Sequence, residues 1–186
     1  MNKNHLIIGI GNIYRGDDGA GLLAARALKA RPNAPLDCID IQESDGSAFA
    51  LMELWRDRNH VVTIDAMNLD GKKVGDLLLF DGLRSLLPLD QLRVSTHAFG
   101  LQEAIALSAS LGTLPKQLTV IAIIGADFRM KEGLSPAVAA AVQHWVQEFP
   151  GSLKATLAHI GPTNQRSEDA RNVTDEQLNQ PGQSYC

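Results

Sequence analysis

The feature that most constrains the fold is a regular alternation of short apolar runs with Ala- and Leu-rich segments over about the first 150 residues. Short apolar runs bounded by turn residues are typical of buried strands, and apolar residues spaced three or four apart are typical of helices. Strands that alternate with helices predict a mostly parallel, twisted sheet. We therefore expect an α/β fold, a single-domain three-layer sandwich in which helices cover both faces of a five-stranded sheet.

The pattern places strands at residues 6–10, 36–41, 61–64, 76–80 and 118–124, and helices at 20–30, 49–55, 98–111 and from Ser135 to about Phe149. Ser47 and Ser135 are suitable caps for the second and fourth helices, and Pro136 suits a first helical turn. The third and fourth strands have no helix between them. A ten-residue turn region joins them, which allows an antiparallel hairpin.

Residues 1–150 form the expected domain, and residues 151–186 form a polar tail that we expect to be weakly structured, with a helical turn at 174–178. The net charge of −4 provides no basic face, so nucleic acid is not an expected partner. No apolar run approaches the roughly 20 residues that span a bilayer. Two cysteines, Cys38 and Cys186, do not make a disulfide framework. We expect a cytoplasmic protein with no membrane partner.

Three polar segments follow expected strands, where sites form in open α/β sheets. They are the loop 9–19, Asp65, and Ser95-Thr96-His97 at the start of a helix. Loops can bring these segments to one edge of the sheet. An acidic residue of the loop, Asp65 and His97 would make a set of two carboxylates and one imidazole. Such a set suits borderline divalent metals such as nickel and zinc, with a coordination position left open.

Each of these residues also has a purely structural interpretation. Asp17 or Asp18 can accept backbone hydrogen bonds at the start of the helix 20–30, as aspartates at helix starts commonly do. Asp65 can be a turn residue in Asp-Ala-Met-Asn, and His97 can simply belong to a first helical turn. These alternatives stay open at the level of single residues.

Other chemistries have less support. Gly9 and Gly11 match the start of a dinucleotide-binding fingerprint, but Tyr14 stands where that fingerprint needs its third glycine. The adjacent carboxylates of Asp17 and Asp18 would also repel a pyrophosphate. The chain has no Gly-x-Ser-x-Gly elbow. Cys38 lies within an expected strand, which is a poor place for a reactive thiolate.

The segment Gly11–Gly21, with the sequence GNIYRGDDGAG, resembles the opening motif of the hydrogenase maturation proteases. Two further segments follow in the order seen in that family. One is a strand that ends in Asp65-Ala66, and the other is the helix start 95–101, with the sequence STHAFGL. The resemblance covers about residues 6–149 and implies a single α/β domain.

The resemblance implies a peptidase, either of aspartic type or dependent on a metal in its substrate. Family members remove a short C-terminal extension from the large-subunit precursor of nickel–iron hydrogenases after nickel has been inserted. The metal-contacting and catalytic set falls on Asp18, Asp65 and His97, and the position of Asp18 is often glutamate elsewhere. The nickel is carried by the precursor, and other divalent metals are expected to fill the site in vitro.

The remaining assignments follow from this interpretation. Asn12 is expected to contact substrate and, with backbone N–H groups of its loop, to stabilise an oxyanion. The Asp45-Gly46 turn is expected to line the same cleft, and Asp17 is assigned to helix capping. Two rival hypotheses are a non-catalytic, nickel-sensing chaperone of the same fold and a nucleotide-binding α/β domain.

Overall fold

The computed structural model describes residues 5–31, 39–84, 92–94 and 96–149, and for 92–94 and 96–99 it describes the backbone alone. Cys38, Cys186 and the expected tail at 151–186, with its turn at 174–178, lie outside the described residues. In the described residues no helix is long and apolar enough to cross a membrane.

The centre of the fold is a mostly parallel sheet in the strand order β2-β1-β3-β6-β4. Strands β2, β1, β3 and β6 run parallel, and β4 runs antiparallel to β6. The short strand β5 pairs antiparallel with the end of β3, off this path. The bounds are β1 His5–Ile10, β2 Ile39–Ser44, β3 His60–Leu69, β4 Leu77–Asp81, β5 Leu92–Val94 and β6 Gln117–Ile124.

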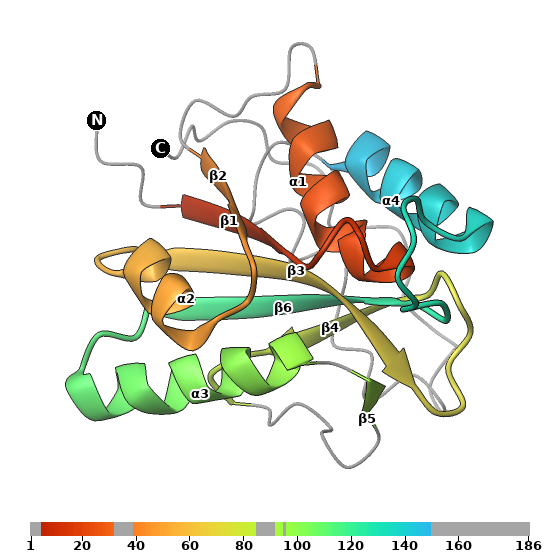
Figure 1. Ribbon diagram of the computed structural model, residues 1–186. Helices are drawn as coiled ribbons and strands as arrows, with labels where there is room; N and C mark the ends of the chain where they lie inside the picture. The colour runs from red at the N-terminus through yellow and green to blue at the C-terminus, as the bar shows by residue number, and fades with distance from the viewer. Residues whose placement is uncertain (1–4, 32–38, 85–91, 95, 150–186) are drawn as a thin grey trace, which may run out of the picture.

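Helices cover both faces of this sheet, which confirms the predicted α/β sandwich (Figure 1). Helices α1 and α4 lie on one face, and α2 and α3 lie on the other. A short 3-10 turn, η1, precedes α1. The bounds are η1 Gly16–Gly19, α1 Ala20–Lys29, α2 Ala48–Trp55, α3 Thr96–Leu111 and α4 Pro136–Glu148.

Alternation along the strands divides the core into two apolar clusters. On β3, Val62 and Ile64 pack under α1 and α4, whereas Val61 and Met67 pack under α2 and α3. This is the period of two expected for a strand buried on both faces. In the second cluster the buried Trp55 Nε1 of α2 donates a hydrogen bond to Ser108 Oγ of α3 at 3.0 Å. That bond satisfies two polar groups inside an apolar layer.

Helix α1 packs unusually close to the strands beneath it. A Cβ atom added at Gly21 would lie 2.1 Å from the carbonyl oxygen of Ile64 and 2.4 Å from that of Ile10. Only glycine fits at this distance, because no real Cβ comes so near to backbone oxygen. The contact holds the start of α1, and with it η1, against the end of β1 and the middle of β3.

Three details differ from the sequence-based expectation. The hairpin between the third and fourth strands is not formed, because β4 crosses to pair with β6. Strand β3 continues past Asp65 to Leu69, where its last residues gain β5 as a partner. Strand β5 itself was not expected, because three residues are too few to give a periodic signal.

Candidate functional site

The loop after β1 folds back on itself and holds Asp18 against the strand end. Gly11 has a φ of +145°, and a Cβ atom there would lie 1.9 Å from the carbonyl oxygen of Asp18. The backbone N–H of Asn12 donates to the same oxygen at 3.2 Å. The motif glycine therefore lets the peptide of Asp18 pack directly on the loop.

Asp18 and Asp65 lie in elements that contact each other, since η1 packs against β3. Asp18 is 4% exposed and Asp65 is fully buried. The pairing of β3 with β1 ends at Ile64, so Asp65 is the first residue of β3 that has no paired residue on β1. The Oδ1 atom of Asp65 accepts a hydrogen bond from the N–H of Ala66 at 2.8 Å.

The expectation that Asp65 ends its strand is wrong, because β3 continues for four more residues to Leu69. Asp65 nevertheless lies where β1 stops, at the carboxyl edge of that strand. By alternation its side chain shares the face of Val61 and Met67, which is the face covered by α2 and α3.

His97 lies in the first turn of α3, as expected, but its side chain is outside the described residues. Its helix is tied to the same edge of the sheet by a close contact. A Cβ atom added at Gly100 would lie 2.1 Å from the carbonyl oxygen of Gly46. The N–H of Gly11 in turn donates to the carbonyl of Ser44 at 3.2 Å. The loop after β1, the turn after β2 and the start of α3 therefore meet at one place.

Asn12 and the Asp45-Gly46 turn, expected to contact substrate, both lie at this edge. The Asn12 Oδ1 atom accepts a hydrogen bond from the N–H of Tyr14 at 2.9 Å, and the side chain is half-buried. Asp45 is exposed, and its Oδ1 atom accepts from the N–H of Ser47 at 3.0 Å. The side-chain oxygens of Asn12 and Asp45 thus each accept a hydrogen bond from a backbone N–H two residues further along, which stabilises the local turn. A role in binding substrate stays a prediction.

The assignment of Asp17 to capping of α1 is wrong. Its buried carboxylate instead joins the loop after β1 to the loop between β6 and α4. It accepts bonds from the N–H groups of Ala126 and Asp127 at 3.0 Å, and from the N–H and Oγ–H of Ser135 at 2.7 and 3.1 Å. Local reasoning missed this role because these partners lie 109 to 118 positions away along the chain.

Burial acts to raise the pKa of Asp17, but the hydrogen bonds from Ala126, Asp127 and Ser135 outweigh it. They hold the pKa below its usual value near 3.8. Asp17 is therefore a structural anion, satisfied by backbone donors. Ser135 stands at the N-cap position just before α4, as expected, but its hydroxyl donates to Asp17 and makes no side-chain capping bond to α4.

A hollow of about 510 Å³ adjoins this junction, lined by Asn68 near the end of β3 and by the residues 126–129 that follow β6. Among the described side chains no group of three His, Cys, Asp or Glu residues could hold a metal ion. The imidazole of His97 lies outside the described side chains. The predicted set of Asp18, Asp65 and His97 therefore stays a prediction.

Comparison with known proteins decides the family. A family model described as hydrogenase maturation protease matches residues 28–151. The chain belongs to the hydrogenase maturation protease family. This confirms the resemblance stated from the motif, and with it the prediction of a peptidase.

Individual relatives agree with this membership. The hydrogenase 2 maturation protease of Escherichia coli is 24% identical over 149 residues, which cover 80% of this chain and 90% of that protein. The hydrogenase expression/formation protein HupD of Thiocapsa roseopersicina is 27% identical over 174 residues, covering 89% and 72% of the two chains.

Solved structures show the same fold. The hydrogenase maturating endopeptidase HybD from Escherichia coli superposes with a TM-score of 0.69 at 23% identity, covering 81% of this chain and 92% of that one. The [NiFe] hydrogenase maturation protease HybD from Thermococcus kodakarensis gives 0.57 at 27% identity, covering 76% and 93%.

Proposed function

We propose that this hydrogenase maturation protease removes a C-terminal extension from the nickel-loaded large-subunit precursor of a nickel–iron hydrogenase. Asp18, Asp65 and His97 contact the nickel that the precursor carries. The observation that supports this most is the meeting of η1, β3 and the start of α3 at the carboxyl edge of β1. We further propose that the protein acts in the cytoplasm, without nucleic acid or membrane partners.

In this proposal the nickel of the substrate orients the junction to be cut. An aspartate of the pair takes a proton from the attacking water, as a general base does. The water oxygen bonds to the carbonyl carbon, the C–N bond breaks, and the leaving amine receives a proton. Asn12 and N–H groups of its loop stabilise the oxyanion that forms on the carbonyl oxygen.

The burial of Asp18 and Asp65 sets a condition on this chemistry. At 4% and 0% exposure, these carboxylates are not on an open surface. An ion held by another protein reaches them only after that protein has docked and the edge of the sheet has opened. Docking of a loaded precursor then acts as the checkpoint, since an empty precursor brings no charge to stabilise the buried carboxylates.

The nucleotide-binding alternative is weakened by the same loop. The backbone of Asp18 packs directly on Gly11, since its carbonyl oxygen lies 1.9 Å from where a Cβ atom of Gly11 would be, and this leaves little room there for a pyrophosphate. Thermal unfolding with and without a dinucleotide tests this alternative directly. A rise in unfolding temperature with ligand concentration would support it.

The activity is tested by incubating the purified protein with the precursor, once loaded with nickel and once without it. We expect the loaded precursor to lose the mass of its extension and the empty precursor to remain intact. No loss of mass from the loaded precursor, together with stable complex formation, would instead support the nickel-sensing chaperone.

A further inference from the structure

Three polar side chains form a row at the opposite edge of the sheet. His5, His60 and Gln117 are the first residues of β1, β3 and β6, and they stand in register across the three parallel strands. Neighbouring strands lie about 4.8 Å apart. By alternation these side chains lie on the face of Ile7 and Val62, which is the face that α1 and α4 cover.

Within the part of the chain that the structure describes, the two histidines carry buried nitrogen atoms with no hydrogen-bond partner. These atoms are Nδ1 of His5 and Nε2 of His60, and the His60 residue is only 9% exposed. The ring centres are 5.7 Å apart. Buried polar atoms in proteins are nearly always satisfied, so two such nitrogens on adjacent rings are candidates for binding a ligand.

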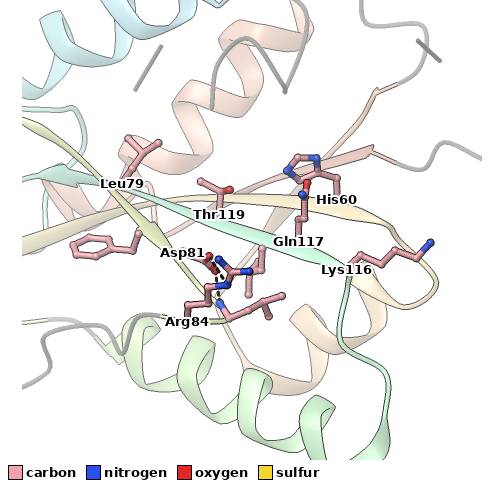
Figure 2. A pocket seen from close by; sticks show the side chains of 10 residues that line it. His60, Leu79, Asp81, Arg84, Lys116, Gln117 and Thr119 are labelled. Atoms are coloured by element: carbon pink, nitrogen blue, oxygen red, sulfur yellow. Dashed lines mark hydrogen bonds and ion pairs between the residues drawn. The ribbon is translucent and has the colours of Figure 1, made fainter. Parts of the chain in front are cut away.

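A cavity connects the His60 ring of this pair to solvent. His60 and Gln117 line a cavity of about 500 Å³ that opens between the start of β6 and the end of β4. Figure 2 shows the His60 ring at this cavity, with the side chain of Gln117 rising from the neighbouring strand toward it. The amide of Gln117 therefore adds an oxygen to the same corner.

We propose that His5, His60 and Gln117 form a binding site for a borderline divalent metal ion such as zinc or nickel. Two imidazole nitrogens and one amide oxygen are ligands that such ions accept, and water completes the shell. With metal–nitrogen bonds of about 2.0–2.1 Å, two rings that share an ion have centres no more than roughly 6.5 Å apart. The observed spacing fits within that limit.

The protonation state of His60 agrees with this role. Burial, and in second place the nearby His5, lower the pKa of the His60 imidazole below its usual value of 6.5. The ring is therefore neutral at physiological pH, which is the form that binds metals.

This site is separate from the one proposed for proteolysis. Asp65 lies five residues further along β3 than His60, which corresponds to about 16 Å at the usual rise of a strand. One ion cannot contact both. The proposed metal site and the proposed proteolytic site can therefore be tested independently.

The test uses the full chain with ¹⁵N-labelled histidine and the substitution His97→Ala, which removes the imidazole of the proposed catalytic set. Zinc is added up to one equivalent while the imidazole nitrogen resonances are recorded by NMR. We expect the resonances of His5 and His60 to shift together at the lowest zinc levels. If the resonances of both residues do not move, the proposal is overturned. That result is expected if a water molecule, and not a metal ion, bridges the two rings.

Substitutions then separate binding from folding. His60→Ala should abolish the zinc-dependent shift of His5 and weaken zinc affinity by about tenfold or more, and Gln117→Ala should weaken it less. His144→Ala is the matched control, because His144 is exposed on α4 and should leave binding unchanged. If His60→Ala does not fold, His60→Phe takes its place, because phenylalanine fills the space of the ring and offers no ligand atom. Zinc affinity equal to the parent in a folded His60 variant would contradict the site.

Discussion

Two regions of the loop after β1 differ sharply, although they are adjacent in sequence. Asp17 faces the loop between β6 and α4, where three N–H groups and a hydroxyl bind its carboxylate. Asp18 follows it in η1, which packs against β3 near Asp65. One motif thus contains an acid that joins two loops and an acid that we assign to chemistry. Burial alone does not distinguish them, since both are buried.

The largest expected effect concerns the proposed catalytic set. Asp65→Ala or His97→Ala should lower the rate of precursor processing by about 10²–10⁴-fold, the range typical of a lost acid–base group. The fold should survive, as checked by circular dichroism. The measurement is the rate of extension loss at equal concentrations of folded enzyme. Unchanged rates in both variants would remove these residues from the site.

The next largest effect is the loss of stability expected when Asp17, the structural one of the two adjacent acids, is replaced. Asp17→Ala leaves the part-buried donors of residues 126, 127 and 135 without their acceptor. We expect a loss of roughly 3 kcal/mol in the free energy of unfolding, which is a fall of roughly 6–12 °C in unfolding temperature for a chain of this size. Calorimetry measures this. A variant as stable as the parent would show that the junction does not support the fold.

A smaller effect is the pH dependence of that junction. The folded pKa of Asp17 is lowered, so its stabilisation is complete above the usual value near 3.8 and is lost as pH falls through the folded value. Urea unfolding from pH 6 downward should show the gap between parent and Asp17→Asn narrowing in acid. A gap that stays constant down to pH 2 would contradict the lowered pKa.

The smallest effect serves as a reference for the others. Arg26 and Glu43 form an ion pair at 2.8 Å, but their side chains are 47% and 31% exposed. Solvent screens such pairs, so Arg26→Ala should change the free energy of unfolding by no more than about 1 kcal/mol. Processing should be unaffected. If Arg26→Ala lowers the free energy of unfolding as much as Asp17→Ala does, the effect of Asp17→Ala cannot be attributed to its buried junction.

The sequence predicted those strands and helices that leave a clear local pattern of apolar residues. The runs around Ile8 and Val120 became buried strands, and the Ala- and Leu-rich segment after Asp18 became α1, because burial on both faces and helical spacing leave clear signals. The hairpin that the sequence allowed between the third and fourth strands does not form, because β4 pairs with β6 through contacts far apart in the chain, which no local pattern encodes.

The location of the candidate residues was predictable to a similar degree, whereas their catalytic and metal-binding roles stay predictions. The sequence predicted that the elements of Asp18, Asp65 and His97 meet at one edge of the sheet, and they do, although β3 continues past Asp65. The role of Asp17 could not be found, because a cap and a long-range junction have the same local sequence. Only the fold brings Ser135 to its carboxylate.

The most direct measurement compares the two adjacent acids. The intact mass of nickel-loaded precursor is followed over time with the parent, Asp17→Ala and Asp18→Ala, each at the same concentration of folded protein. We expect Asp17→Ala to shorten the precursor at nearly the parent rate and Asp18→Ala to leave it intact. Full processing by Asp18→Ala, with loss of processing in Asp17→Ala, would contradict the assignment of the two carboxylates.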